Sequence, residues 1–371
     1  MSHEYEIGLA KEDLDTPALL IDLNAMERNL HKMAAYFETV EARLRPHVKL
    51  HRATPLLAHK QLQAGAIGVT CAKLSEAEVM AASGITDILI ANEIVGTRKV
   101  QRLVNLATYA DVIVAVDSFE NVDELSAHAQ AKGVSLRVLV EVNIGHNRCG
   151  VAPFEPALAL AQAVDRAHNL VFSGIMGYDG HCTFKVEEDQ REACSQQAND
   201  LLVATRRYIE EAGLAVGIVS AGGTFTYKVA AETPGVTEVQ AGTYLLMDTA
   251  FQEKGVRDFE CTLTVLATVI SKPTWAENHD LAILDVGRKG MDVHLGLPEV
   301  KGLDGATLFS MSQEHGRVRL EGPAKNLQVG DKLELWVRNS NDTINLYDRF
   351  YAVRDGIVEA VWEIPARGRS T

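Results

Sequence analysis

The segments DVIVAV (Asp111–Val116) and LRVLVEVN (Leu136–Asn143) decide the fold class of this 371-residue chain. Each is a short, nearly continuous apolar run rich in β-branched residues, which is typical of a strand covered on both faces. A longer stretch with helical character separates them. The sequence therefore indicates an α/β fold built on a parallel sheet.

The same alternation of strands and helices extends from about residue 43 to residue 242. Eight strands separated by helices predict a TIM-type (β/α)8 barrel rather than an open, doubly wound sheet. The six further strand candidates are Arg43–Lys49, Ile67–Cys71, Asp87–Ala91, Val171–Met176, Val216–Ser220 and Val236–Gly242.

After about Phe259 the pattern changes to alternating apolar and polar residues, which is typical of antiparallel strands. The runs are CTLTVLATVI, HDLAILDVG, HGRVRLEG, DKLELWVRN and RFYAVRDGIVEAVWEI. The early run Thr16–Asp22 (TPALLID) is expected to join the same sheet. We therefore predict a barrel over residues 24–255 and a β domain formed by residues 1–23 and 256–371.

Charge and cysteine content narrow the functional class. With 36 basic and 50 acidic residues the net charge is -14, so the long-range field disfavours nucleic-acid and anionic-membrane partners. The five cysteines form no CxxC pair, and we expect free thiols in a reducing compartment. The N-terminal segment is acidic and has no apolar signal region, which favours a cytoplasmic location.

Polar residues mark the expected carboxyl ends of the barrel strands, where such barrels place their active sites. Lys49 ends the first strand within PHVKLHR, which suits a depressed pKa and nucleophilic amine chemistry. The competing interpretation is a lysine at the barrel rim. Arg148 follows the fifth strand, and Tyr178 and His181 follow the sixth. Arg148 suits a phenolate, carboxylate or phosphate, unless it is a solvated loop residue.

Glycine-rich turns follow the seventh and eighth strands, where barrels of this type commonly hold phosphate on backbone N–H groups. Together with Lys49 and Arg148, these turns supply what pyridoxal 5'-phosphate (PLP) requires: an amine for its aldehyde, amides for its phosphate and polar groups for its ring. The turn residues predicted to bind the cofactor are Ser220, Gly222, Gly223, Thr224, Gln240, Gly242 and Tyr244.

Several motifs in chain order give the sequence a specific resemblance to a known family. They are TPALLID, RPHVKLH, GAIGVTCAKLSEAE, VEVNIGHNRCGV, GYDGH, SAGGT, QAGTY and NLYDRFYAVRDGIVEAVWEIPARG. From about residue 14 to residue 368 the chain resembles the D-threonine aldolase/D-serine dehydratase family, PLP enzymes of the alanine racemase-like fold. The resemblance implies a barrel, a C-terminal β domain and a homodimer whose pockets both subunits build.

The resemblance also implies roles for individual residues. Lys49 matches the Schiff-base lysine, Arg148 an arginine near the cofactor's phenolic oxygen, and Tyr178 a tyrosine at its ring. His315, in SQEHG, matches a histidine that reaches the site from the second domain. The turn Ser220–Thr224 matches the phosphate cradle.

One departure from the family concerns its metal. The family carries a His-x-Asp or His-x-Cys pair shortly before a threonine and NLYD, and here those positions hold Asn339 and Asn341. Neutral amides replace imidazole, carboxylate or thiolate poorly as ligands of Zn²⁺ or Mn²⁺. We therefore predict no metal ligands and treat a divalent ion as doubtful, although Asp342 is an alternative ligand.

The leading functional hypothesis is a lyase that cleaves a D-configured β-hydroxy-α-amino acid, of D-threonine or 3-hydroxyaspartate type, to glycine and an aldehyde. Without the metal a histidine must act as base, and the candidates are His315, His181 and His51, which could instead orient Lys49. The alternatives are a metal-independent racemase, an α,β-eliminating dehydratase or, in another class, a non-catalytic PLP carrier. The expected partner is a small amino acid.

Overall fold

The computed structural model describes residues 4–185, 187–275 and 280–371. The chain divides into two compact units. The barrel unit comprises His31–Lys49, Ala53–Tyr244 and Arg369–Thr371, and the β unit comprises the residues up to Leu30, Leu50–Arg52 and Leu245–Gly368. The predicted domain limits were residues 24 and 255, whereas this division falls within helix α1 (Leu23–Phe37) and after Tyr244.

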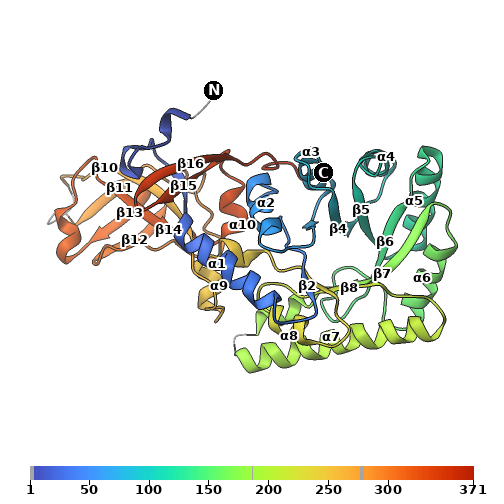
Figure 1. The fold of residues 1–371 in the computed structure, drawn as a ribbon. Helices are drawn as coiled ribbons and strands as arrows, with labels where there is room; N and C mark the ends of the chain where they lie inside the picture. The colour runs from blue at the N-terminus through green and yellow to red at the C-terminus, as the bar shows by residue number, and fades with distance from the viewer. Residues whose placement is uncertain (1–3, 186, 276–279) are drawn as a thin grey trace. The chain divides into compact units, whose positions relative to one another are not determined.

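All eight predicted barrel strands are present, in the parallel order β2-β9-β8-β7-β6-β5-β4-β3 (Figure 1). Between the first and the last strand of this order, a parallel bridge joins His47 to Thr70, so the chain closes the barrel just beyond the end of β2. The strands are β2 (Arg43–Leu44), β3 (Val69–Cys71), β4 (Asp87–Glu93), β5 (Asp111–Val116), β6 (Leu136–Glu141), β7 (Leu170–Gly177), β8 (Ile218–Ala221) and β9 (Glu238–Val239).

Burial explains why these runs become central strands. Leu89, Ile113, Leu139 and Met176, from four neighbouring strands, form one buried cluster. Side chains on the opposite face of these strands are covered by the surrounding helices, so both faces are apolar. The helices are α2 (Pro55–Gln63), α3 (Leu74–Ala82), α4 (Thr97–Leu106), α5 (Phe119–Lys132), α6 (Glu155–Arg166), α7 (Glu188–Glu211) and α8 (Tyr227–Glu232).

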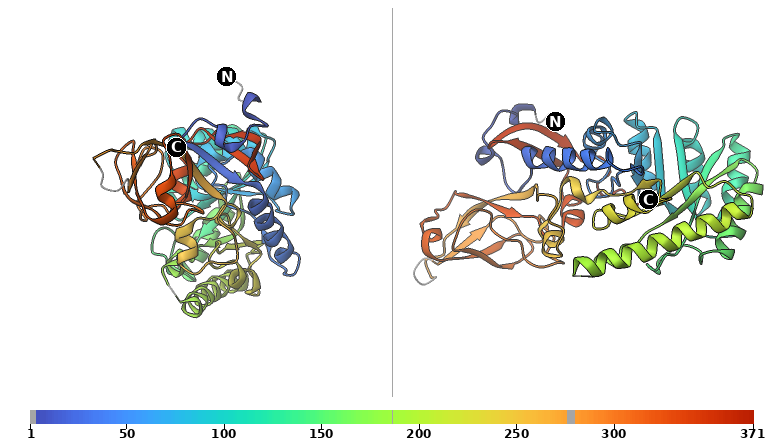
Figure 2. Two further views of the ribbon diagram at one scale, coloured as in Figure 1. Left: turned by 90° about the vertical axis from the view of Figure 1, so that its left-hand side faces the viewer. Right: turned by 60° about the horizontal axis from the view of Figure 1, so that its bottom comes forward.

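Helix α7 is the longest helix of the barrel unit, with 24 residues, and it packs against β7, β8 and α8 (Figure 2). A short 3-10 helix, η3 (Gly180–Phe184), lies between β7 and α7 and also packs against α7. The segment after β7 is therefore held against the start of α7. None of the helices in the described part of the chain combines the length and apolarity that crossing a membrane requires.

The β unit contains one sheet in the order β12-β13-β11-β10-β1-β15-β16, with β14 also paired to β10. The predicted early strand is β1 (Ala18–Asp22), which pairs with β10 and β15 as expected. The other strands are β10 (Leu263–Ser271), β11 (Leu281–Leu284), β12 (Ala306–Met311), β13 (Gly316–Leu320), β14 (Lys332–Trp336), β15 (Arg349–Arg354) and β16 (Ile357–Glu363).

Two details of the β unit differ from the sequence prediction. Strand β12 was missed, because ATLFSM shows no clean alternation and its pairing with β13 is interrupted by a register shift near Ser310. The predicted run HDLAILDVG begins at His279, which lies outside the described residues. The unit also contains α9 (Thr249–Glu253), α10 (Ser340–Ile344) and the 3-10 helices η1 (Glu4–Glu6), η2 (Lys11–Asp13) and η6 (Gly322–Asn326); η4 (Thr243–Leu245) crosses the division.

Candidate active site

The ring of Tyr178 is the centre of a polar group in the barrel unit. Tyr178 directly follows β7. The Nζ atom of Lys49 lies 5.9 Å from the ring centroid, and the guanidinium carbon of Arg148 lies 5.6 Å from it. The ring of His146 meets Tyr178 edge-on at 5.3 Å. Three of the site residues predicted from the sequence therefore come together here.

Lys49 is set up for amine chemistry. Water reaches its side chain, but protein atoms surround it on most sides, and this desolvation is the main reason that its pKa is lowered. The positive charge of Arg148 lowers the pKa further, and the carboxylate of Glu76 opposes the shift. A lowered pKa increases the fraction of neutral amine, which is the nucleophilic form.

Arg148 lies beside a pair of carboxyl groups that sequence reasoning missed, the buried Glu141 and the half-buried Glu93. Its Nη2 atom is 4.0 Å from Oε1 of Glu141, which ends β6 and is buried. Burial, followed by the charge of Glu93, raises the pKa of Glu141 to about 8. The carboxyl of Glu141 therefore keeps its proton at neutral pH.

Tyr178 keeps its phenolic proton. Burial is the main cause that raises its pKa to about 12, with a smaller contribution from Asp179. Asp179 is itself fully buried, and its carboxylate accepts hydrogen bonds from Ser195 Oγ at 2.6 Å and Thr226 Oγ1 at 3.1 Å. These bonds fix the chain beside Tyr178 and hold the phenol in place.

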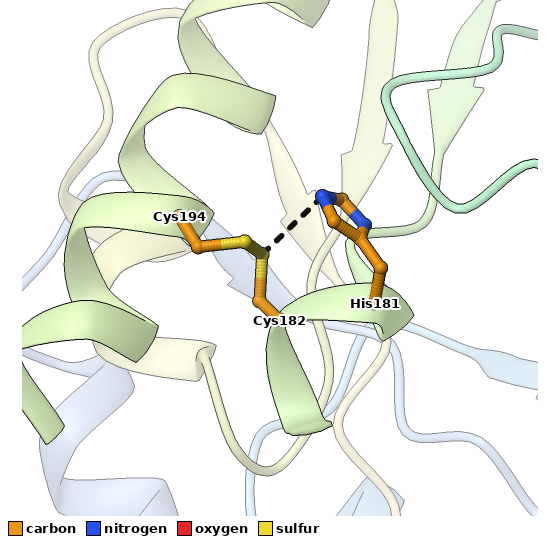
Figure 3. A group of neighbouring side chains, drawn as sticks. All are labelled: His181, Cys182 and Cys194. Carbon is orange, nitrogen blue, oxygen red and sulfur yellow. Dashed lines mark hydrogen bonds between the residues drawn. A yellow bond between two sulfur atoms is a disulfide. The ribbon is translucent and has the colours of Figure 1, made fainter. Parts of the chain in front are cut away.

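His181 lies in η3 next to a disulfide that the sequence did not predict. Cys182 and Cys194 are joined, with their Cα atoms 5.6 Å apart, and Nε2 of His181 lies 3.6 Å from Cys182 Sγ (Figure 3). The expectation of free thiols is therefore wrong for this pair. It failed because the cysteines are 12 residues apart, and only the packing of η3 on α7 brings them together. Cys71, Cys149 and Cys261 are free.

The turn after β8 has the backbone of a phosphate cradle. Gly222 has a φ of 68°, a conformation that favours glycine, and a β-carbon there would lie 2.7 Å from Cβ of Ala230. A β-carbon on Gly223 would lie 3.4 Å from Cε2 of Tyr178, so this backbone passes close to the central ring. Thr224 Oγ1 accepts a hydrogen bond from the backbone N–H of Tyr244 at 3.1 Å.

The turn after β9 supports that cradle. Gln240 donates a hydrogen bond from Nε2 to Ser220 Oγ at 2.9 Å. Tyr244 is fully buried, and its hydroxyl accepts a hydrogen bond from Gln61 at 3.0 Å. A β-carbon on Gly242 would lie 2.1 Å from the carbonyl oxygen of His47, so only glycine fits there. The two predicted turns are thus bonded to each other.

Two of the predicted histidines belong to the β unit. His51 is fully buried. His315 is exposed on the turn between β12 and β13, and its carbonyl oxygen accepts a hydrogen bond from Ser312 N at 2.8 Å. His315 also lines a hollow of about 820 Å³ together with Trp275 and Phe309. The catalytic roles predicted for these two histidines stay predictions.

The residues of the family's metal position do not fit a divalent ion. The side-chain nitrogen of Asn339 donates hydrogen bonds to Asp292 Oδ2 and to Asp342 Oδ2, both at 2.8 Å. Asn339 therefore presents N–H groups, not lone pairs, to the two carboxylates around it, and Asn341 adds no charge. A site for Zn²⁺ or Mn²⁺ requires basic imidazole, carboxylate or thiolate ligands. The absence of the metal stays a prediction.

The barrel unit does fit PLP. An anionic, aldehyde-bearing ring requires an amine, a cation near the ring and backbone N–H groups for its phosphate. Lys49 supplies an amine with a lowered pKa, Arg148 supplies the cation, and the glycine turn supplies N–H groups that a side chain would block. Sequence reasoning did not assign a role to His146, although it stands two residues before Arg148. Burial, Arg148 and His181 lower the pKa of His146, which keeps its imidazole neutral.

Comparison with known proteins gives matches along nearly the whole chain. The profile described as alanine racemase, N-terminal domain, matches residues 21–250, and the profile described as putative serine dehydratase domain matches residues 262–353. A D-threonine aldolase from Arthrobacter sp. is 38% identical over 361 residues, which cover 96% of this chain and 94% of the relative.

Two further matches have similar coverage. A 3-hydroxy-D-aspartate aldolase from Paracoccus denitrificans (strain Pd 1222) is 36% identical over 371 residues, covering 98% of this chain and 94% of the relative. The crystal structure of a D-threonine aldolase from Filomicrobium marinum superposes with a TM-score of 0.93 at 36% identity, covering 98% and 99% of the two chains.

Proposed function

The chain belongs to the PLP-dependent aldolase family of alanine racemase-like fold, and from that premise we propose that it cleaves a D-configured β-hydroxy-α-amino acid to glycine and an aldehyde. D-Threonine and 3-hydroxyaspartate types are the proposed substrates, because relatives that match the whole chain are named for them. The observation that carries the proposal is Lys49, whose pKa is lowered, beside Arg148 and Tyr178 at the barrel strand ends.

The barrel unit would hold the cofactor through three sets of residues. Lys49 offers its amine to the aldehyde, the turn Ser220–Thr224 offers backbone N–H groups to the phosphate, and Arg148 and Tyr178 offer polar atoms to the ring. When bound, PLP withdraws electrons from the Cα of an amino acid and so weakens a bond to that carbon. The protein contributes position and proton transfer.

The proton on the substrate's β-hydroxyl needs a base, and we assign this role to His181. Its Nδ1 atom is buried and, among the described residues, has no hydrogen-bond partner. His181 also lies near His146, with the two rings 6.5 Å apart. When the hydroxyl proton is removed, the oxygen electrons form the C=O bond of the aldehyde and the bond between Cα and Cβ breaks. Its electron pair stays on Cα, which takes up a proton to give glycine. An imidazole nitrogen that carries no proton can accept the hydroxyl proton.

A second candidate function is a metal-independent reaction at Cα, either racemisation or α,β-elimination. Asn339 favours it, because its amide faces two carboxylates with N–H donors and leaves no ligand set for a metal that would activate the hydroxyl. Elimination releases ammonia and a keto acid, whereas retro-aldol cleavage releases glycine and an aldehyde. The products therefore distinguish the two functions.

The experiment that tests the proposal measures aldehyde, glycine and ammonia from a panel of D- and L-amino acids, with chelator and with added Mn²⁺. We expect aldehyde and glycine in equal amounts from D-threonine or D-3-hydroxyaspartate, without a requirement for added metal. Ammonia without aldehyde would replace the proposal by elimination, and no turnover of any D-β-hydroxy amino acid would refute it.

We further propose that the protein works as a cytoplasmic homodimer. The family resemblance and the net charge of -14 support a dimer that binds neither nucleic acid nor membrane. Light scattering of the purified protein coupled to gel filtration measures the assembly directly, and a mass of one chain (40.4 kDa) would contradict a dimer.

A further inference from the structure

The disulfide joins the segment after β7 to the long helix α7, both within the barrel unit. Cys182 lies four residues after Tyr178, and Cys194 lies in the second turn of α7. The neighbour of Cys194, Ser195, donates its hydroxyl hydrogen bond to Asp179 at 2.6 Å. One turn of α7 thus holds this segment twice, once through a covalent bond and once through a buried hydrogen bond.

The two sulfurs differ in access and in surroundings. Cys182 is fully buried, whereas Cys194 is only partly buried. Figure 3 shows the ring of His181 next to the Cys182 sulfur, with Nε2 3.6 Å away. An external thiol therefore meets Cys194 first, and His181 is placed to supply a proton to Cys182 as it leaves.

We propose that Cys182 and Cys194 form a reversible disulfide that fixes residues 178–184 on α7, and that a dithiol reductant opens it. This redox site goes beyond cleavage of an amino acid, and its effect on turnover rests on the proposed function because Tyr178 and His181 lie in the segment that it fixes. In the oxidised state the segment is held at both Cys194 and Ser195; in the reduced state the covalent link is lost, whereas the Ser195–Asp179 hydrogen bond remains.

The exchange follows ordinary thiol–disulfide chemistry. One sulfur of the reductant loses its proton to solvent and, as thiolate, bonds to Cys194 Sγ. The S–S electron pair moves to Cys182 Sγ, which takes a proton from Nε2 of His181 in its imidazolium form. The second sulfur of the reductant then bonds to the first, and Cys194 Sγ leaves with the proton of that second thiol. The products are two cysteine thiols and a cyclic disulfide in the reductant, and His181 regains from solvent the proton that the first thiol released. Two electrons pass from the dithiol to the protein.

One observation favours a reversible bond over a permanent one. The other three cysteines, Cys71, Cys149 and Cys261, are free, so the chain is not organised around disulfides. The prediction of a reducing compartment agrees with this, because disulfides there are usually transient and respond to redox conditions. The side chains of His181, Cys182 and Cys194 bring two sulfurs and one imidazole nitrogen within 4.8 Å of one another, so a Zn²⁺ site is the rival that the test must distinguish.

The first arm of the test counts thiols in the full-length protein. The protein is equilibrated with oxidised glutathione, desalted, denatured and alkylated, and its intact mass is measured. We expect three alkyl groups, rising to five after dithiothreitol, with the 182–194 link found by peptide mapping. In the control variant Cys261→Ser the numbers should be two and four. Five alkyl groups before reduction, or one Zn²⁺ per chain that protects the pair, would overturn the proposal.

The second arm measures whether the bond fixes the segment. Hydrogen exchange of the backbone amides in residues 180–185 should become about tenfold faster on reduction, as expected when a covalent restraint on a local opening is lost. The double variant Cys182→Ser/Cys194→Ser should exchange at the reduced rate with or without dithiothreitol. Equal exchange in the two states of the wild type would refute the role of the bond.

Neither arm requires turnover, so the inference and the proposed function fail separately. A protein without aldolase activity that still shows three and five alkyl groups would retain the redox site. If the protein is active, reduction should change kcat in the wild type and in Cys261→Ser, but not in the double variant. An unchanged kcat together with faster exchange would mean that the disulfide controls the mobility of the segment only. That outcome would contradict its proposed effect on turnover.

Discussion

The barrel unit and the β unit arrange their polar side chains differently at the positions that the family uses for function. In the barrel unit the side-chain nitrogens of Lys49 and Arg148 surround the same ring, with Lys49 Nζ and Arg148 Cζ within 6 Å of its centroid, and the charge of Arg148 lowers the pKa of Lys49. In the β unit the two N–H donors of Asn339 are used by Asp292 and Asp342. An anionic ligand would offset the positive charge around the ring in the barrel unit. In the β unit the N–H donors of Asn339 already have acceptors.

This difference locates the function of the chain. Like charges placed together lower the stability of the protein alone, and such groups are typical of binding and catalytic sites. Asn339 and its carboxylate partners are already hydrogen-bonded, so binding an ion would not stabilise them to a comparable extent. We therefore infer that the barrel unit keeps the cofactor chemistry of the family. Asn339 in the β unit is engaged in hydrogen bonds, and the absence of a metal there stays a prediction.

The largest expected effect comes from removing the amine in the barrel unit. Lys49→Ala should lower kcat by at least about 10³-fold, because the amine of Lys49 supplies the nucleophile that the cofactor requires. Lys132→Ala, an exposed lysine of α5, is the matched control and should retain activity. Retention of activity in Lys49→Ala would remove the contrast between the two units.

The second-largest effect on kcat is expected from removing the imidazole of His181, the proposed base in the barrel unit. His181→Asn should lower kcat by about 10²- to 10⁴-fold, the range for loss of general acid–base catalysis, while the bound cofactor's absorbance is kept. The exposed His168→Asn is the control. If His181→Asn turned over normally, the base would have to be sought elsewhere, with His146, His51 and His315 as the remaining histidines to test.

A third prediction attempts to restore the metal position of the β unit. The double variant Asn339→His/Asn341→Asp should gain Mn²⁺ binding, which would raise its Tm by about 5 °C at a hundredfold excess over the dissociation constant. The Tm of the wild type should not change with Mn²⁺, and chelator should leave its kcat within about twofold. A metal-dependent wild type would show that Asn339 and its neighbours still bind an ion.

The sequence predicts those features of the fold and the site that depend on the position of a residue in its own strand or helix. Lys49, Arg148 and Tyr178 could be placed together because the carboxyl ends of barrel strands converge on one face, so strand position alone implied proximity. The Cys182–Cys194 bond, the Glu93–Glu141 pair and the approach of His146 depend on how loops and α7 pack, which no periodicity encodes. Strand β12 was missed because its irregular register left no alternation to find.

The smallest effect concerns the carboxyl pair beside Arg148. The folded state holds the Glu141 proton up to about pH 8, whereas the unfolded chain releases it near its ordinary pKa of 4.5. Stability should therefore fall as pH rises between these values, because the unfolded state binds fewer protons there. In urea unfolding, Glu141→Gln should reduce the change in the free energy of unfolding with pH over this range. The exposed Glu120→Gln should leave that change as in the wild type. An unchanged slope in Glu141→Gln would contradict the raised pKa of this carboxyl.

The central claim is that the amine at position 49 carries the cofactor. The most direct measurement is borohydride reduction of the protein incubated with PLP, followed by peptide mass spectrometry. The account predicts loss of the yellow absorbance and one phosphopyridoxyl group on Lys49 per chain. An unmodified Lys49, or label spread over surface lysines with no site preferred, would contradict it.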